Sequence, residues 1–324
     1  MNINNDFKEI FSVINKYDNI LIAGHKNPDG DCIGSCVALG LALSKMGKKV
    51  TMYMKDMPQE FEILKGIYLY TNKLEDNYDL VIVLDCADDG RYEIKEQFKN
   101  AKETINIDHH KDNPMFATYN YCDTTSSSVS EIMYEVFKDN NVELDKDIAE
   151  ALYVGIISDT GLFQNRNTTA KTMSYVADLL NYKVDFTKII ARLFYSKTYS
   201  EMKLMGKAFE NAKLYHNGDI IISTLTKEEI KELNAKSNET SSIISMIRQV
   251  EGTKIACFIY EPIPHNVKVS FRCDVPYDVC EISQTIGGGG HVLAAGAIVK
   301  NKPIEEVRDI VLNAMIEQIE RYEN

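Results

Sequence analysis

Strand-length runs rich in valine, isoleucine and leucine constrain the fold of this chain more than any other feature. They lie at 19–26 (NILIAGHK), 48–54 (KKVTMYM), 79–87 (DLVIVLDCA) and 103–110 (ETINIDHH). Runs of this kind indicate strands buried on both faces, and the stretches between them have helical spacing. We therefore predict an α/β fold whose N-terminal domain is doubly wound on a mainly parallel sheet.

Helical patterns separate and follow these strands. The segment 31–47 (DCIGSCVALGLALSKMG) ends at a glycine suited to a helix C-terminus. Apolar spacing also predicts helices over 125–141 and 147–161, the second of which ends in SDTG. Cys32 and Cys36 are one helical turn apart and are predicted to be core residues.

The pattern changes after Asn217-Gly218, where a smaller α/β domain is predicted. Its first strand and helix lie at 219–233, with Thr226 and Glu229 spaced as a capping box. The runs 253–261 and 266–274 predict a hairpin, GGGGH at 287–291 is expected to interrupt the next helix, and 303–323 should form a final helix. We predict an N-terminal domain over 1–190, a helical linker over 191–214, and a second domain over 215–324 across a cleft.

Charge and cysteine content exclude several classes of protein. The formal net charge is −12, with 48 acidic and 36 basic residues, which is the wrong sign for a protein that grips long nucleic acid. The seven cysteines are scattered and odd in number, so neither a disulfide framework nor a zinc ribbon is predicted. No signal peptide or membrane span is evident, and we expect a cytoplasmic protein without membrane association.

Polar residues follow the predicted strands at one edge of the sheet. His25, Asp29 and Asp31 in GHKNPDGD follow the first strand, Asp85 closes the DLVIVLD strand, and the triplet 108–110 (DHH) closes another. Ligands bind in open α/β sheets beyond the carboxyl ends of the strands. A further carboxylate, Asp159 of SDTG, joins them if its helix returns to that edge.

Each of these residues also has an ordinary structural interpretation. Asp29 and Asp31 suit a tight turn and a helix N-cap, while Asp85 and Asp159 suit caps of the segments that follow them. The DHH triplet alone could be a polar strand end. Arg166 and residues 167–169 are candidates for substrate contact or for another cap. Because carboxylates crowded into one crevice repel one another, their convergence favours bound cations.

The residue types indicate which metal these carboxylates would hold. Imidazole and carboxylate ligands without thiolate suit manganese, with iron, cobalt or zinc as alternatives and magnesium disfavoured. There are enough ligands for two ions about 3.5 to 4 Å apart, an arrangement that supports in-line phosphoryl displacement. One histidine of the DHH triplet can bind metal while the other reaches substrate phosphate, and Asp108 can orient a neighbouring imidazole.

In their order and spacing, these motifs resemble the DHH phosphoesterase family, and VSFRCD at 269–274 with GGGGHVLAAG at 287–296 resembles its DHH-associated C-terminal domain. The resemblance implies two manganese ions bridged by Asp85, with His110 on the substrate phosphate. It assigns residues to four groups: a first ion held by His25, Asp29 and Asp85; a second held by Asp31, Asp85, His109 and Asp159; a catalytic set of Asp85, Asp108, His109 and His110; and a substrate pocket formed with Arg272, Gly288, Gly289, Gly290 and His291.

The length and two-domain form resemble the family branch that cleaves short oligoribonucleotides and adenosine 3',5'-bisphosphate. The resemblance implies hydrolysis of short 5'-phosphorylated oligoribonucleotides to nucleoside 5'-monophosphates and of the bisphosphate to AMP. Alternatives are a phosphodiesterase for linear or cyclic di-AMP and a nucleotide-binding module without turnover. The acidic balance disfavours exonucleases of long single strands, and the basic C-terminal motif of the pyrophosphatase branch is not found. The expected partners are adenine nucleotides and short oligoribonucleotides, and a homodimer is left open.

Overall fold

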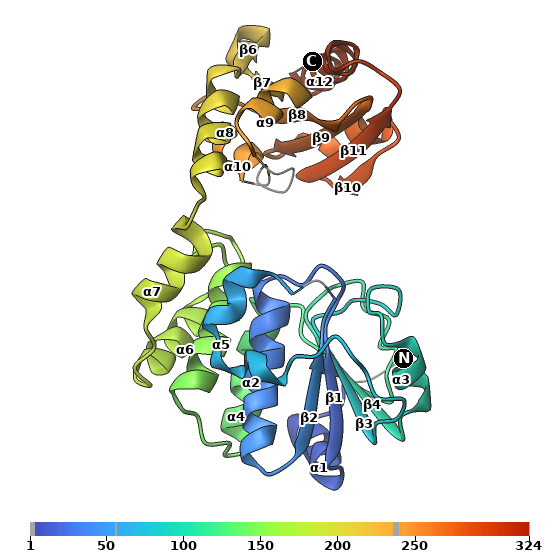
Figure 1. Ribbon diagram of the computed structural model, residues 1–324, viewed down its shortest axis with the longest axis vertical. Helices are drawn as coiled ribbons and strands as arrows, with labels where there is room; N and C mark the ends of the chain where they lie inside the picture. Colours follow the sequence, from blue (N-terminus) through green and yellow to red (C-terminus); the bar gives the residue numbers. More distant parts are fainter. Residues whose placement is uncertain (1–3, 56, 236–239, 241, 324) are drawn as a thin grey trace. The chain divides into compact units, whose positions relative to one another are not determined.

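The computed structural model describes residues 4–55, 57–235, 240 and 242–323. They fall into two compact units, Met1–Ser196 and Lys197–Asn324, each of which is described by itself (Figure 1). The finer division of the chain into domain, linker and second domain stays a prediction.

A five-stranded parallel sheet forms the centre of the first unit, which confirms the predicted fold class. The strand order is β2-β1-β3-β4-β5, so the chain reverses direction across the sheet between β1 and β3, where ligands bind in doubly wound folds. The strands are β1 (Asn19–Ala23), β2 (Lys49–Tyr53), β3 (Leu80–Leu84), β4 (Glu103–Asp108) and β5 (Tyr119–Cys122).

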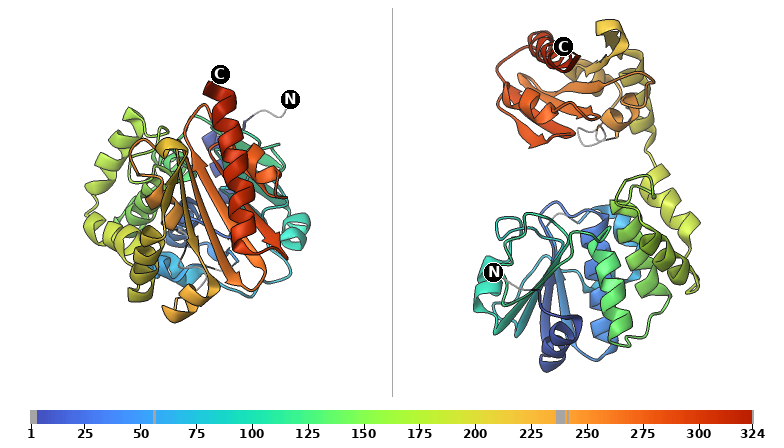
Figure 2. Two further views of the ribbon diagram at one scale, coloured as in Figure 1. Left: turned by 90° about the horizontal axis from the view of Figure 1, so that it is seen from above. Right: turned by 180° about the vertical axis from the view of Figure 1, so that it is seen from behind.

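Helices cover both faces of this sheet unequally. Alternate residues of β1, such as Ile20 and Ile22, pack into a large core with the helices of one face, whereas Leu21 packs on the other face with the aromatic side chains around α3. Figure 1 shows α2, α4 and α5 together on one side of the sheet and α3 on the other, and the view from behind in Figure 2 agrees. The helices are α1 (Phe7–Lys16), α2 (Gly30–Lys45), α3 (Lys95–Asn100), α4 (Val129–Asp139), α5 (Lys146–Asp159), α6 (Ala170–Leu180) and α7 (Phe186–Ile190).

Glycines allow α2, α4 and α5 to meet closely beside the sheet edge. A Cβ added at Gly34 of α2 would lie 2.5 Å from the carbonyl oxygen of Ala151 in α5. A Cβ added at Gly155 of α5 would lie 1.8 Å from Oγ of Ser130 and 2.7 Å from Oδ1 of Asp31. Only glycine fits at these contacts, and the first turns of α2 and α4 meet there.

Shorter elements complete the first unit. Two 3-10 turns follow β2, and a π-helical turn follows α7. Their bounds are Gln59–Ile63, Lys65–Leu69 and Ala191–Tyr195.

The second unit is a six-stranded mixed sheet with helices on both faces. Its order is β10-β11-β9-β8-β7-β6, in which only β7 and β8 are parallel. Helix α12 packs against one face of this sheet, and α8, α9 and α10 pack against the other. The elements are α8 (Tyr199–Glu210), β6 (Lys213–Tyr215), β7 (Ile220–Leu225), α9 (Lys227–Glu232), α10 (Ile243–Ile247), β8 (Ile255–Ile263), β9 (Asn266–Cys273), α11 (Val279–Gln284), β10 (Gly289–His291), β11 (Ala294–Lys300) and α12 (Ile304–Glu323), with a 3-10 turn at His216–Gly218.

Most of the expected local features of this unit are present, with one correction. Thr226 and Glu229 form the predicted capping box, and β8 and β9 form the predicted hairpin. The expectation that GGGGH breaks a helix was wrong, because Gly289–His291 is a strand paired with β11. Within the described residues, no helix combines the length and apolar content needed to cross a membrane.

Candidate metal centre

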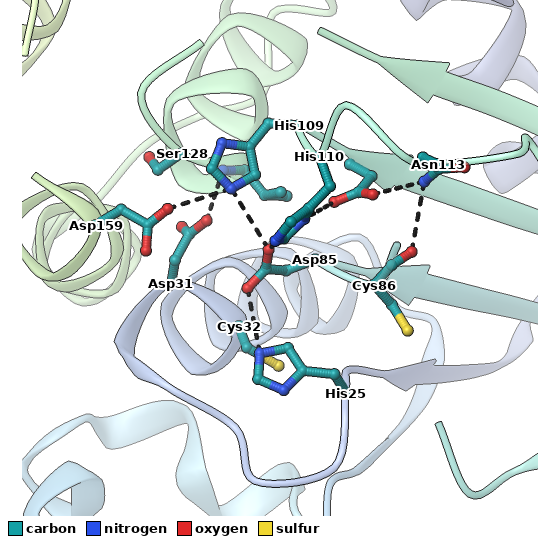
Figure 3. Close-up of polar contacts among 12 residues, drawn as sticks. His25, Asp31, Cys32, Asp85, Cys86, His109, His110, Asn113, Ser128 and Asp159 are labelled. Atoms are coloured by element: carbon teal, nitrogen blue, oxygen red, sulfur yellow. Dashed lines mark hydrogen bonds and ion pairs between the residues drawn. The ribbon is translucent and has the colours of Figure 1, made fainter. Parts of the chain in front are cut away.

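The predicted histidines and carboxylates of the first unit converge at the carboxyl edge of its sheet (Figure 3). His25 follows β1, Asp85 follows β3, and His109 follows β4, while Asp159 is the last residue of α5. Since β1, β3 and β4 are neighbours in the sheet, residues just beyond their ends are brought together. The topological switch between β1 and β3 thus lies beside His25 and Asp85.

His25, Asp29 and Asp85 form one group of potential ligands. The Nε2 atom of His25 lies 3.5 Å from Oδ2 of Asp85 and 3.8 Å from Oδ2 of Asp29. Asp29 is also the N-cap of α2, because its Oδ1 accepts hydrogen bonds from the amides of Asp31 and Cys32 at 3.1 Å. Asp29 is therefore confirmed as a helix cap, and its other carboxylate oxygen, Oδ2, remains free to act as a potential ligand beside His25.

Asp85 is the centre of the arrangement. Its backbone has φ +53°, in the left-handed region, and such strain persists in proteins mainly where the surroundings require it. Its carboxylate is buried, and among the described residues Oδ1 has no hydrogen-bond partner, although it lies 3.7 Å from Nε2 of His109. A buried carboxylate oxygen without a donor is costly. A cation between these groups would satisfy it.

His109 and Asp159 belong to a second group of potential ligands. Nε2 of His109 lies 3.2 Å from Oδ2 of Asp159, and Asp31 is close enough to share an ion with both. Asp159 therefore does return to the strand edge, as the sequence required. Asn167 donates hydrogen bonds to the carbonyl oxygens of Asp159 and Ser127, which ties the end of α5 to the start of α4. The predicted cap nearby is Thr169, at the start of α6.

Asp31 is held by the beginning of α4. Its Oδ2 accepts from the amide of Val129 at 2.6 Å and its Oδ1 from the amide of Ser130 at 2.8 Å. The positive end of a helix dipole stabilises a carboxylate placed in this way. Each carboxylate oxygen has a further lone pair, so Asp31 can cap α4 and still ligate a metal.

His110 faces the same site through a different contact. Its Nδ1 lies 2.8 Å from Oδ1 of Asp108, whose Oδ2 accepts from Nδ2 of Asn113 at 2.6 Å. The strand β4 ends at Asp108, so the two histidines are not forced to opposite faces, and their ring centroids lie 4.8 Å apart. Asp108 is therefore positioned to orient His110, as the sequence predicts.

Backbone carbonyls select the tautomers that metal binding needs. Nδ1 of His25 lies 2.9 Å from the carbonyl oxygen of Lys26, and Nδ1 of His109 lies 3.4 Å from that of Ser126. A carbonyl oxygen accepts only, so each Nδ1 carries the hydrogen and each Nε2 presents its lone pair to the carboxylates. Metal-ligating histidines are typically held by such a bond on the other nitrogen.

The electrostatics of the group call for positive charge. Burial raises the pKa of Asp31 well above its usual value, and the charges of Asp159 and Asp85 raise it further. Burial opposes a charged imidazole at His109, but the hydrogen bond with Asp159 and the charge of Asp31 raise its pKa to about 10. In the absence of metal, protons bound to Asp31 and His109 reduce the repulsion among these carboxylates, and metal ions could neutralise the same charge. The donor set fits divalent metal.

The site opens into a cavity of about 360 Å³. Besides the predicted ligands, Lys26, Asn27 and Arg91 line it. Sequence reasoning missed these three residues. Lys26 and Asn27 lie inside the GHKNPDGD motif, and that position was an available signal, whereas Arg91 reaches the cavity from the loop after β3 without any pattern to reveal it. The cationic side chains suit an anionic substrate.

The second unit places Arg272 and His291 in one row of its sheet. Arg272 of β9 pairs with Ala294 of β11, and Ala294 pairs with His291 of β10, so the two side chains share a face. Arg272 is half-buried, and burial followed by the charge of Arg248 lowers its pKa. Nη1 of Arg272 donates to the carbonyl oxygen of Phe271 at 2.8 Å, but within the described residues Arg272 forms no ion pair with a carboxylate, so the rest of its guanidinium could bind a phosphate.

Two of the four glycines before His291 are required by close packing. A Cβ at Gly288 would lie 2.3 Å from Oγ of Ser283 and 2.4 Å from the carbonyl oxygen of Gly296. Gly290 has φ +144°, and a Cβ there would lie 2.6 Å from Cα of Ala295. Gly289 lies between them in β10 and meets no neighbour within 4 Å.

Comparisons with known proteins find two family domains in the chain. The model of the DHH family, N-terminal domain, matches residues 19–156, and that of the DHHA1 domain matches residues 217–321. The chain is 32% identical to a probable bifunctional oligoribonuclease and PAP phosphatase NrnA of Streptococcus mutans, with 90% of this chain and 93% of that protein covered. It is 28% identical to the bifunctional oligoribonuclease and PAP phosphatase NrnA of Bacillus subtilis, covering 90% and 92%.

A more distant relative and two solved structures extend the comparison. The cyclic-di-AMP phosphodiesterase PdeA of Listeria monocytogenes is 24% identical, and the match covers 94% of this chain but 48% of that protein. An exopolyphosphatase-related protein from Bacteroides fragilis superposes with a TM-score of 0.87 at 22% identity, covering 96% and 95%. The exonuclease RecJ bound to manganese has a TM-score of 0.58 at 13% identity, covering 96% and 94%. These two structures share the fold.

Proposed function

The chain belongs to the DHH family, and on this basis we propose that it is a manganese-dependent phosphoesterase with two metal ions. Its substrates are short 5'-phosphorylated oligoribonucleotides, cleaved to nucleoside 5'-monophosphates, and adenosine 3',5'-bisphosphate, cleaved to AMP. The observation that carries the proposal is the buried Asp85 carboxylate, with one oxygen toward His25 and an unpartnered oxygen toward His109. The full-length similarity to bifunctional oligoribonuclease and PAP phosphatases supports the choice of substrates.

We assign the ligands to two ions that share Asp85. His25, Asp29 and Asp85 would hold the first ion, and Asp31, Asp85, His109 and Asp159 the second. Bound in this way, the metal would supply a water nucleophile at neutral pH and stabilise the charge on the transferring phosphoryl group. The mixed imidazole and carboxylate set favours manganese over magnesium.

His110 is proposed to bind the scissile phosphate. A carboxylate at Nδ1 favours the charged imidazolium, and the hydrogen bond to Asp108 raises the pKa of His110. The imidazolium then donates from Nδ1 to Asp108 and from Nε2 to a phosphate oxygen. This arrangement helps to neutralise the charge of the substrate and orients it for in-line attack.

The second unit is proposed to recognise the other end of the substrate. The Arg272 guanidinium can bind a terminal phosphate by two charge-assisted hydrogen bonds, and His291 lies in the same row of the sheet. Amides of Gly288, Gly289 and Gly290 can add to this contact. Both proposed substrates carry a 5' phosphate and have a scissile phosphorus on a 3' oxygen, so one pocket can serve both.

The net charge of −12 limits the proposed substrates to short ones. A phosphodiesterase acting on linear or cyclic di-AMP is the second candidate, favoured only by similarity to a relative of which this chain covers about half. Binding without turnover would instead make the protein a nucleotide-binding module.

The test is hydrolysis of a substrate panel by manganese-loaded protein. The panel contains adenosine 3',5'-bisphosphate, 5'-phosphorylated oligoribonucleotides of increasing length, linear and cyclic di-AMP, and pyrophosphate, with products separated chromatographically. Release of 5'-monophosphates from the bisphosphate and the shortest oligonucleotides is expected. Preferential cleavage of cyclic di-AMP or pyrophosphate would reject the assignment, and tight binding of all nucleotides without any product would reject catalysis.

A further inference from the structure

Cys32 lies beside the proposed first ion, although its spacing in the sequence indicates only a core residue. It is in the first turn of α2 and is fully buried. Its Sγ, a ring nitrogen of His25 and a carboxylate oxygen of Asp85 all lie within 4.8 Å of one another. Figure 3 shows the sulfur next to the His25 ring, on the helix that also carries Asp31.

The position of this sulfur is fixed by close packing. A Cβ added at Gly24 would lie 2.0 Å from Sγ of Cys32, so only glycine between β1 and His25 leaves room for the thiol. Sδ of Met54 lies 3.9 Å from the sulfur. Cys36 is the neighbour one turn along α2. Its sulfur is 3.6 Å from the same Gly24 Cβ position, but in the part of the chain that the structure describes it belongs to no group of potential metal ligands. The Cys32 thiol is thus held toward His25 and Asp85.

His25 and Asp85 therefore take part in two alternative ligand sets. Asp29 completes one with a carboxylate oxygen, its side chain is 58% exposed, and it lines the cavity. Cys32 completes the other with sulfur from the buried side. Manganese and magnesium prefer oxygen, whereas zinc, cobalt and cadmium accept thiolate readily. The choice between Asp29 and Cys32 is a choice between hard and soft cations.

We propose that thiophilic divalent cations bind at this position through His25, Asp85 and Cys32, whereas manganese and magnesium bind through His25, Asp85 and Asp29. The inference rests on the proposed metal centre. Coordination replaces the S–H bond by a metal–sulfur bond and releases the proton to solvent, without oxidation of either partner. Zinc, cobalt and cadmium then compete with manganese for His25 and Asp85, and draw the shared ligands away from the cavity.

The test is a titration of the metal-free, reduced protein with cobalt, followed by absorption spectroscopy. Thiolate ligation produces a sulfur-to-cobalt charge-transfer band in the near ultraviolet, and ligation by nitrogen and oxygen does not. The wild type and a Cys36→Ala variant should show the band, whereas Cys32→Ala should not. Cys36→Ala is the matched control because Cys36 is buried on the same helix one turn away.

Competition gives the second measurement. Zinc should displace manganese from the wild type, and its affinity should fall by about tenfold or more in Cys32→Ala, since even residues that only support a ligand contribute that much. Manganese affinity, followed by its paramagnetic resonance signal, should stay the same. A zinc affinity equal in both proteins would reject Cys32 as a ligand.

If Cys32→Ala fails to fold, extended X-ray absorption fine structure of the zinc-loaded wild type tests the proposal by measuring the distances from zinc to its ligands. A zinc–sulfur distance of about 2.3 Å is expected, and a shell of nitrogen and oxygen alone would overturn the inference. A charge-transfer band that persists in Cys32→Ala would overturn it as well. Neither result would bear on phosphoesterase activity, because no substrate is present, so failure of this inference is distinguishable from failure of the proposed function.

Discussion

His110 and Asp108 form a direct hydrogen bond in which Nδ1 of the imidazole lies 2.8 Å from a carboxylate oxygen. Asp108 is fully buried at the end of β4, whereas the His110 side chain is 34% exposed. A buried carboxylate thus orients an accessible imidazole. Burial raises the pKa of the Asp108 carboxyl, but the hydrogen bond and charge of His110 outweigh it, and the net shift is downward.

Asp108→Ala should therefore lower kcat/KM by about 10- to 100-fold while manganese content stays unchanged, because only the orientation and charge of His110 are lost. The raised pKa of His110 means that the charged form is lost as pH rises through that pKa. Removing Asp108 lowers the pKa, so the alkaline limb of the kcat/KM profile should move to lower pH. Asn113→Ala is the control, since it leaves the His110 contact in place. An unshifted limb would exclude this role.

Asp85→Asn should abolish turnover without unfolding the protein. The loss should be about a thousandfold or more, because metal-ion stabilisation of transition-state charge contributes several kcal/mol. Elemental analysis should find fewer than two manganese ions per chain. The exposed Asp89, four residues further along, gives the matched control Asp89→Asn. Near-native rates in Asp85→Asn would refute the bridging role.

Chelation should inactivate the protein, and manganese should restore more activity than magnesium does. The imidazoles proposed as ligands, His25 and His109, would disfavour magnesium, which prefers oxygen and keeps much of its water. The measurement is the initial rate on adenosine 3',5'-bisphosphate after dialysis against chelator and addition of each metal. Full activity of protein proven metal-free by elemental analysis would contradict the assignment.

Arg272→Ala should remove the preference for adenosine 3',5'-bisphosphate over 3'-AMP. The two compounds share the scissile bond, and only the first has the 5' phosphate that Arg272 is proposed to bind. Binding energy at that remote phosphate positions the reacting centre, so the variant should lose kcat/KM on the bisphosphate alone. Arg321→Ala, on the exposed side of α12, is the control. A preference undiminished in Arg272→Ala would remove the residue from the site.

Affinity for oligoribonucleotides should stop rising beyond a few nucleotides. With a net charge of −12, an extended cationic track for phosphates is not expected. Two or three neutralised phosphates give a slope of log affinity against log salt of roughly −1.4 to −2.1 for a single strand. Binding of catalytically inactive Asp85→Asn to a length series at several salt concentrations measures both quantities. A steeper slope with preference for long strands would indicate an exonuclease of long substrates.

The sheet and its functional edge could be predicted from sequence because they depend on short-range patterns. Buried parallel strands are continuous apolar runs, and their carboxyl ends meet at one edge wherever the helices lie. The strand β5 escaped prediction, since its four residues YNYC are too few to establish a period and include no aliphatic residue. The strand β10 escaped because glycine lacks strand propensity, although Gly290 is required there by packing against Ala294 and Ala295.

The interior of the site was less predictable than its ligands. The six residues between His25 and Cys32 form a turn and the start of α2, so the distance between the two side chains depends on how the helix returns over the strand. Arg91 enters the cavity from an irregular loop, where no periodicity exists to read. Asp31 is held by the amides of Val129 and Ser130, which are 98 and 99 residues away in the sequence, so this contact depends on the packing of α2 against α4.

Gly155 of α5 connects the packing of the helices to the geometry of the proposed metal site. It leaves α5 so close to α2 and α4 that a single methyl group would reach both the Asp31 carboxylate and the Ser130 hydroxyl. The distance between the backbones of Asp31 in α2 and Asp159 at the end of α5 is thus limited by the close contact of these helices at Gly34 and Gly155. If metal binds as proposed, this packing would limit how far Asp31 and Asp159 can move apart to hold a larger ion. Placing the same ligand residues on a scaffold whose helices stand further apart would therefore not reproduce the proposed centre.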